Sequence, residues 1–153
     1  MKFNTKVIHG GQQHDPSTGA VMPPIYHTST FAQKSPGVHT GYEYSRADNP
    51  TRTALEHALE SIENGARGLA FSSGLAAIDC VLRLLKPNDE VIAMDDLYGG
   101  TYRLFTKFYQ DLGIKFHFID ISDVELFQSK INDKTKLVWI ETPTNPLMKL
   151  ADI

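Results

Sequence analysis

The sequence contains one cysteine, Cys80, among its 153 residues. A single cysteine forms no intramolecular disulfide, so the fold does not depend on a disulfide framework. Such low cysteine usage is typical of proteins from a reducing compartment. The first residues also lack the apolar stretch of a secretory signal peptide. We therefore expect a cytoplasmic protein.

Several other features are missing, and each excludes a class of function. No apolar run approaches the roughly 18 residues of a membrane-spanning helix. The net charge is −3 and no basic cluster is present, which argues against nucleic acid as a partner. The six histidines show no metal-ligand spacing, so we expect no metal site. Neither a Walker loop nor a GxGxxG motif occurs, which argues against a nucleotide site.

What is present is the composition of an ordinary globular protein, with 41% hydrophobic and 22% charged residues. Residues 1–48 are rich in glycine and proline and show no sustained helical or strand period. Because this segment also carries large apolar and aromatic residues, we expect an extended arm that packs on another subunit. Residues 49–153 instead alternate between helical and strand patterns, which is typical of an α/β domain.

The alternation begins with a helix at Asn49, a residue that favours the N-cap, followed by Pro50 at the first helical position. Asn64 and Gly65 then end this helix. An apolar helix that runs to Lys86 is expected to be largely buried, with Cys80 in the core. Further helices are expected over 101–112 and 124–131, and strands over 69–71, 91–94, 115–120 and 137–140. This order predicts a mostly parallel sheet with right-handed crossovers.

Three distinctive loops follow the expected strands, at residues 72–74, 95–100 and 141–146. Ligands in parallel sheets bind at the carboxyl ends of the strands, so we expect these loops to face one crevice. The small residues at 72–74 precede a helix and leave backbone N–H groups free, which predicts a phosphate site. The alternative is a tight strand–helix turn that binds no ligand.

Five motifs then resemble a known family in their order and spacing. They read YEYSR, NPTR, SGLAA, DDLYGGT and ETPTNP, at residues 42–46, 49–52, 73–77, 95–101 and 141–146. Together they resemble the pyridoxal-phosphate (PLP) enzymes of cysteine and methionine metabolism, the cystathionine γ-lyase and γ-synthase group. The resemblance implies a fold-type I α/β architecture, with a mostly parallel sheet flanked by helices, of which residues 49–153 form the first part of the large PLP-binding domain.

The resemblance also implies which residues hold the cofactor. Ser73, Gly74 and Leu75 match the turn that binds the PLP phosphate through backbone N–H groups. Tyr98 matches the tyrosine that stacks on the pyridine ring and takes part in proton transfer, so it is the expected catalytic residue. An ordinary half-buried tyrosine is the alternative interpretation for Tyr98.

Further residues match positions around the cofactor and the substrate. Tyr44 and Arg46 resemble the pair that reaches the phosphate of a neighbouring subunit, although an arginine in a turn can also be a plain surface residue. Asn145 resembles the asparagine beside the cofactor and the substrate carboxylate, whereas Asn-Pro is also a common turn. Glu43 and Arg103 match positions near the distal end of the substrate, or are solvated charges.

The lysine that binds PLP covalently lies, in this family, in a Ser-x-Thr-Lys context that this sequence does not contain. Lys136 precedes an expected strand and is not that lysine. We therefore expect this chain to be the N-terminal part of a longer enzyme. The resemblance implies that this enzyme is a homo-oligomer, a tetramer. The expected reaction is γ-elimination of cystathionine to cysteine, 2-oxobutanoate and ammonia. A γ-synthase or related γ-replacement enzyme is the alternative, and a non-catalytic phosphate-binding or subunit-binding module is a second one.

Overall fold

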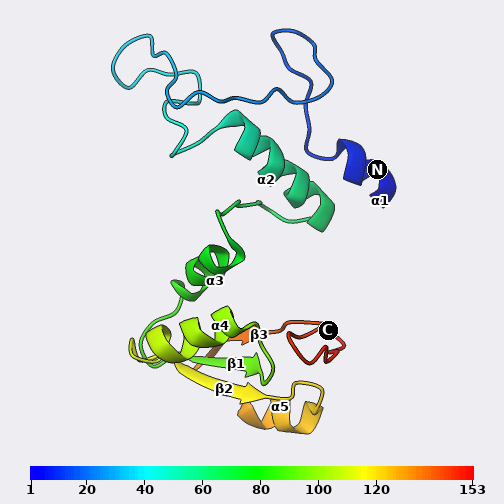
Figure 1. Cartoon of the computed structure of the whole chain (residues 1–153), viewed down its shortest axis with the longest axis vertical. Coiled ribbons are helices and arrows are strands. Elements are labelled where there is room, and N and C mark those ends of the chain that lie inside the picture. The colour runs from blue at the N-terminus through cyan, green and yellow to red at the C-terminus, as the bar shows by residue number, and fades with distance from the viewer. The chain divides into compact units, whose positions relative to one another are not determined.

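The computed structural model describes all residues from Met1 to Ile153. The chain forms two compact units, Met1–Ala70 and Phe71–Ile153 (Figure 1). The end of the expected arm, residue 48, lies inside the first unit, directly before its longer helix. None of the helices is long and apolar enough to cross a membrane.

The first unit contains two helices, α1 (Phe3–His9) and α2 (Pro50–Glu63). The predicted limits of α2 are confirmed: the Asn49 side chain accepts a hydrogen bond from the backbone N–H of Thr51 at 2.9 Å. Asn64 ends the helix in the left-handed conformation, with φ at 52°. The expectation that residues 1–48 have little regular structure missed α1, a short helix that packs against α2.

The contact between the end of α1 and α2 depends on small residues. A Cβ on Gly11 would lie 2.1 Å from the backbone oxygen of His57, and Gly11 has φ at +69°. A Cβ on Gly10 would lie 2.6 Å from the Oγ of Ser61. Only glycine allows so close an approach of the chain to the helix at these two positions.

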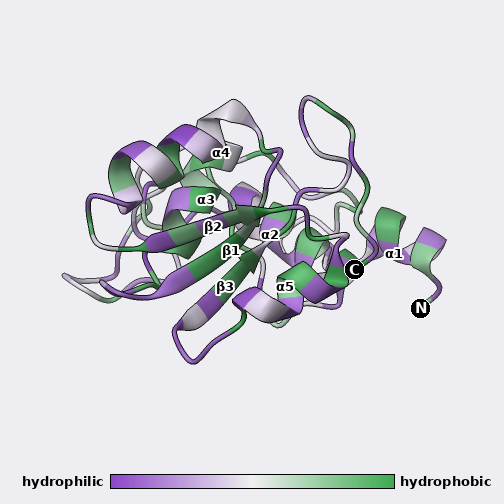
Figure 2. Ribbon diagram, turned by 90° about the horizontal axis from the view of Figure 1, so that it is seen from below, coloured by the Kyte–Doolittle hydropathy of each residue, from purple (hydrophilic) through white to green (hydrophobic).

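The second unit contains a three-stranded sheet in the order β2–β1–β3. Its strands are parallel, as predicted. The strands are β1 (Glu90–Met94), β2 (Lys115–Ile119) and β3 (Thr135–Trp139). Strand β1 lies in the middle and all five of its residues are buried, which explains its unbroken apolar run from Val91 (Figure 2).

Helices α3 (Gly74–Leu82), α4 (Gly99–Leu104) and α5 (Val124–Lys130) accompany the sheet, and the π-helix η1 (Phe105–Tyr109) continues α4. The fully buried Phe105 is central to the core. Its ring stacks on Phe116 of β2 at 4.6 Å between centroids and meets the edge of Trp139 of β3 at 5.9 Å. These aromatic contacts join η1 to both outer strands.

Two expectations about secondary structure were wrong. Residues 69–71 form no strand, because no neighbouring strand pairs with them; all the sheet contacts are among β1, β2 and β3. The loop at 72–74 therefore follows an irregular segment. The helix expected over 101–112 begins at Gly99 and becomes π-helical at Phe105, where the N–H of Gln110 bonds to a carbonyl five residues earlier.

Helix α3 also differs from its prediction, since it ends at Leu82 rather than Lys86. The following N–H groups bond three residues back, from Leu84 to Val81 and from Leu85 to Leu82, and Pro87 then stops helical bonding. The helix is not largely buried, because this unit covers only one of its faces. Cys80 lies on the uncovered face and is exposed, so its expected place in the core was wrong.

Candidate active site

The carboxyl ends of β1 and β3 are joined by hydrogen bonds between their loops. We call residues 95–98 the β1 loop and residues 140–149 the β3 loop. The carboxylate of Glu141 accepts the backbone N–H of Tyr98 at 2.8 Å through Oε2. Its other oxygen, Oε1, accepts the indole N–H of Trp139 at 3.2 Å. Glu141 therefore connects the end of β3 to Tyr98, the N-cap residue of α4.

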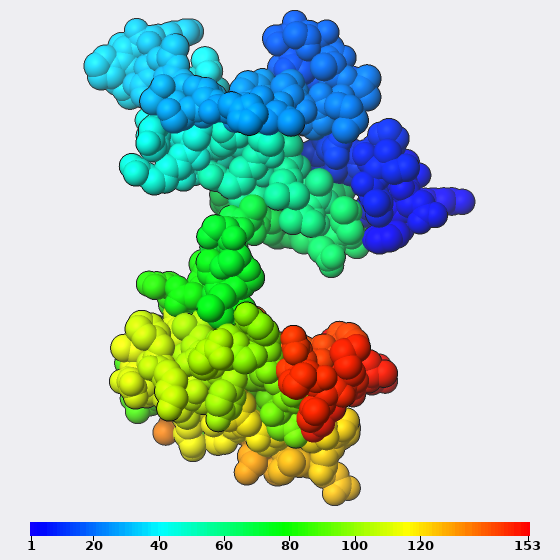
Figure 3. Space-filling view, in the orientation of Figure 1, coloured from blue at the N-terminus to red at the C-terminus, as the bar shows by residue number.

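A second carboxylate connects the two loops in the opposite direction. Asp96 is buried, and its Oδ2 accepts the hydroxyl of Thr144 and the backbone N–H of Leu147, the latter at 2.8 Å. The Thr144 side chain is only 1% exposed and also accepts the backbone N–H of Lys149 at 2.8 Å. The C-terminal residues, coloured red in Figure 3, lie directly against the rest of this unit.

The loop after β2 joins this edge through an ion pair. The Nζ of Lys149 lies 2.7 Å from a carboxylate oxygen of Asp95 and 3.6 Å from one of Asp120. The hydrogen bond to Asp95 raises the pKa of Lys149. Hydrogen bonds from Ser122 lower the pKa of Asp120, and the charge of Lys149 acts in the same direction. All three strands thus end in loops that are tied together by charged and polar contacts.

Tyr98 stands at the start of α4 and its side chain is half-exposed, at 50%. The ring lies over Gly100, where a Cβ would come within 2.4 Å of its Cε1 atom. Its hydroxyl makes no hydrogen bond, so it is available to a ligand. Arg103 and Asn145 are exposed as well, on α4 and on the β3 loop. The structure therefore brings Tyr98 and the Asn145 loop together, which the sequence predicted from topology.

The N-terminus of α3 has the features of an anion site. The Ser73 side chain caps the helix by accepting the N–H of Ala76 at 3.1 Å. The N–H groups of Gly74 and Leu75 have no hydrogen-bond partner in the chain, as is usual in the first turn of a helix. The space around Gly74 is open, with no atom within 4 Å of a would-be Cβ. Free donors at a helix N-terminus fit a phosphate group.

Helix α3 is also held by a hydrogen bond between Asp79 and Tyr109 of η1, which the sequence analysis did not predict. The hydroxyl of Tyr109 in η1 donates to the carboxylate of Asp79 at 2.8 Å. Arg83 also bonds to Asp79 at 2.8 Å and lowers the pKa of that carboxyl. Burial raises the pKa of Tyr109 to about 12, so this hydroxyl remains a donor at neutral pH. The only signal in the sequence was the polar stripe formed by Asp79, Arg83 and Lys86 on an otherwise apolar segment.

In the first unit, Tyr44 and Arg46 lie together on an exposed turn. The guanidinium carbon of Arg46 is 4.9 Å from the centroid of the Tyr44 ring, a cation–π contact. Glu43, on the same segment, is also exposed. The structure thus pairs two of the predicted phosphate ligands and leaves both accessible.

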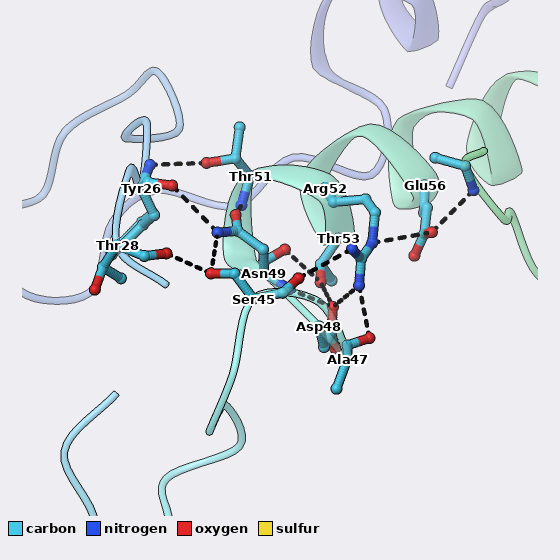
Figure 4. Close-up of polar contacts among 11 residues, drawn as sticks. Tyr26, Thr28, Ser45, Ala47, Asp48, Asn49, Thr51, Arg52, Thr53 and Glu56 are labelled. Carbon is cyan, nitrogen blue, oxygen red and sulfur yellow. Dashed lines mark hydrogen bonds and ion pairs between the residues drawn. The ribbon is translucent and has the colours of Figure 1, made fainter. Parts of the chain in front are cut away.

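The turn that carries Arg46 is held by a polar network on the N-terminus of α2 (Figure 4). Arg52 donates to the carbonyl oxygens of Ser45 at 3.2 Å and Ala47 at 2.7 Å. The amide of Asn49 donates to the Oγ of Ser45 at 3.0 Å. The NPTR motif therefore fixes the backbone on both sides of Arg46.

The sequence profile of one family, described as Cys/Met metabolism PLP-dependent enzyme, matches residues 4–153. The chain belongs to this family. Its members are enzymes that depend on pyridoxal 5'-phosphate, and the donors at the N-terminus of α3 and the exposed ring of Tyr98 fit such a group. The prediction of the family and of its cofactor is confirmed.

Relatives with different activities are similar to this PLP-family chain. It is 52% identical to the cystathionine beta-lyase of Coxiella burnetii over 152 residues, which are 99% of this chain and 39% of the relative. It is 52% identical to the cystathionine gamma-lyase of Bacillus subtilis over 153 residues, covering 100% of this chain and 40% of the relative. It is 53% identical to a probable cystathionine gamma-synthase of Herpetosiphon aurantiacus over 151 residues, covering 99% and 47%.

Solved structures confirm the fold class of this family member. The crystal structure of metB from Corynebacterium glutamicum matches with a TM-score of 0.93 and 44% identity, over 99% of this chain and 40% of that one. Cystathionine gamma-lyase from Lactobacillus plantarum, complexed with L-serine, matches with a TM-score of 0.90 and 44% identity, over 98% and 39%. The chain thus spans about two fifths of the length of most of these relatives.

Proposed function

We propose that the protein to which this chain belongs cleaves cystathionine by γ-elimination. Water is consumed, the bond between the γ-carbon and sulfur breaks, and cysteine, 2-oxobutanoate and ammonia are released. The substrate carbons undergo no net redox change, so no further co-reactant is needed. Membership of the PLP family supports the proposal, because removing a γ-substituent requires the electron sink that PLP supplies when bound.

The residues at the carboxyl edge of the sheet have distinct tasks in this proposal. The free N–H groups of Gly74 and Leu75, with Ser73 as the cap, bind the phosphate. The ring of Tyr98 stacks on the pyridine, and its hydroxyl, which has no partner in the chain, holds and transfers a proton. Asn145 orients the cofactor and the substrate carboxylate.

The arm of residues 1–48 acts across a subunit interface in this proposal, within a homotetramer. Tyr44 and Arg46 reach the phosphate bound by a neighbouring subunit, where the planar guanidinium forms charge-assisted hydrogen bonds. The exposure of both side chains and the rigid backbone around Arg46 support this assignment. Glu43 and Arg103, also exposed, bind the distal end of the substrate.

A mixed-oligomer experiment tests the arm. In the complete enzyme, Arg46→Ala should weaken PLP retention while the fold is kept. Mixing with subunits that retain Arg46 but lack the PLP-binding lysine should restore activity. No recovery in any mixture would place Arg46 in the site of its own subunit or outside any site.

The names of the relatives include two activities that compete with γ-elimination, γ-synthase and β-lyase. The complete enzyme should be given cystathionine alone, and in a second reaction an O-acylhomoserine with cysteine. Release of 2-oxobutanoate from cystathionine as the faster reaction supports γ-elimination. Accumulation of cystathionine from the ester with little breakdown would assign a γ-synthase, and release of pyruvate with homocysteine would assign a β-lyase.

A further inference from the structure

Two carboxylates, the buried Asp96 and the half-buried Glu141, accept hydrogen bonds that join the β1 loop to the β3 loop. Asp96 belongs to the β1 loop but holds Thr144 and Leu147 of the β3 loop. Glu141 belongs to the β3 loop but holds the backbone N–H of Tyr98 in the β1 loop. Each carboxylate therefore fixes the loop opposite to its own. Such reciprocal bonds join segments that are more than 40 residues apart in the chain, with separations of 43 and 48 residues.

The hydrogen bonds of the two carboxylates hold the backbone at or beside Tyr98 and Asn145, the two residues of these loops that are proposed to contact the cofactor. Tyr98 is held at its own amide, directly at the base of the exposed ring. Asn145 follows Thr144 and precedes Leu147 by two residues, so the bonds of Asp96 lie on both sides of it. Neither Tyr98 nor Asn145 makes a side-chain hydrogen bond that would fix it independently.

We infer that Asp96 and Glu141 form a carboxylate clamp and are positioning residues for the reaction. They do not touch the substrate; they set where Tyr98 and Asn145 stand. This inference rests on the proposed function for the roles of Tyr98 and Asn145, whereas the clamp itself rests on the hydrogen bonds described above. A shift of about 1 Å in a group that contacts the reacting molecule can lower the rate about 100-fold, so a positioning residue has a large effect.

The hydrogen bonds of the two carboxylates predict different effects on activity when each residue is replaced by its amide. A single oxygen of Asp96, Oδ2, accepts both of its hydrogen bonds, so the one oxygen of asparagine can replace it. Glu141 uses both oxygens, one for Tyr98 and one for Trp139, and glutamine offers only one acceptor. Its NH₂ group would face an N–H donor. Asp96→Asn should therefore lower kcat/KM much less than Asp96→Ala does, whereas Glu141→Gln should impair the enzyme about as much as Glu141→Ala.

The test uses the complete enzyme and two readouts. The first is amide hydrogen exchange in the PLP-free protein, which reports the clamp without any activity. Glu141→Ala should increase the exchange rate of the Tyr98 amide by at least about tenfold, because this hydrogen bond is its only protection in the structure. The second is kcat/KM for cystathionine with PLP saturating, which should fall about 10- to 100-fold in Glu141→Ala and Asp96→Ala.

A double variant then separates positioning from a general loss of stability. If Glu141 acts through Tyr98, Glu141→Ala combined with Tyr98→Ala should be no slower than Tyr98→Ala alone. Unchanged exchange of the Tyr98 amide in Glu141→Ala would overturn the clamp. Faster exchange with unchanged kcat/KM, while Tyr98→Ala is slow, would overturn the positioning role. If Tyr98→Ala itself is fully active, the proposed function of Tyr98 fails, and with it the catalytic purpose of the clamp.

Discussion

Replacement of Gly100 by alanine should lower activity without lowering stability. A Cβ at this position would lie 2.4 Å from Cε1 of Tyr98 and 3.1 Å from Cδ1 and Cζ, and these are its three nearest atoms. Ordinary carbon–carbon contacts need about 3.5 Å or more, so the ring must move by about 1 Å. A displacement of that size at the proposed cofactor face corresponds to a loss of about 100-fold in kcat/KM.

The fold should tolerate the same substitution. The Tyr98 side chain is half-exposed, so its ring can turn away into solvent. Alanine is also the better helix former, by up to about 0.8–1.0 kcal/mol relative to glycine inside a helix. The thermal unfolding midpoint of Gly100→Ala should therefore equal that of the unaltered enzyme or rise slightly.

Gly99→Ala is the matched control, because Gly99 is the neighbouring glycine in the same first turn of α4. Its would-be Cβ meets only the guanidinium of Arg103, at an ordinary distance of 3.5 Å. The assay is kcat/KM for cystathionine together with thermal unfolding, for both variants of the complete enzyme. Equal activity of Gly99→Ala and Gly100→Ala would refute the interpretation that the absence of a side chain at Gly100 leaves the space that the Tyr98 ring needs.

Two further predictions concern stability. Phe105→Ala should destabilise the enzyme by about 3–5 kcal/mol in denaturant titrations, because its ring is fully buried against Phe116 of β2 and Trp139 of β3. Replacement of the half-exposed Phe108 by alanine should cost much less. Hydrogen bonds from Asn132 and His117 lower the pKa of Glu90 from 4.5 to about 2, so its contribution is complete above pH 4.5 and is lost as the pH falls toward 2. Glu90→Gln should flatten the pH dependence of the denaturant midpoint in that window; an unchanged slope would contradict the assignment.

The parts of the fold that depend on neighbouring residues could be predicted from the sequence. The helix α2 began and ended where Asn49, Pro50 and Asn64 indicated, because caps act within one turn. The unbroken apolar run at Val91 indicated a buried strand, and β1 is buried along its whole length.

The parts that depend on distant partners could not be predicted in this way. Residues 69–71 have the composition of a strand, but a strand forms only beside another strand. The polar residues of the carboxylate clamp were noticed only as members of family motifs. Their partners, such as Thr144 for Asp96, are fixed by the three-dimensional position of the loops and leave no local pattern.

The central claim is that the carboxyl edge with Tyr98 is the active site of a PLP-dependent enzyme that cleaves cystathionine. The most direct measurement compares Tyr98→Ala with Tyr102→Ala in the complete enzyme, by PLP affinity and by 2-oxobutanoate release. Both tyrosines lie at α4 and are equally exposed, at 50% and 49%, so their removal is a matched perturbation. Loss of a stacked ring worth about 0.5–1.5 kcal/mol should weaken PLP binding about two- to tenfold and slow keto-acid release in Tyr98→Ala alone. Equal PLP affinity and equal 2-oxobutanoate release in the two variants would contradict the account.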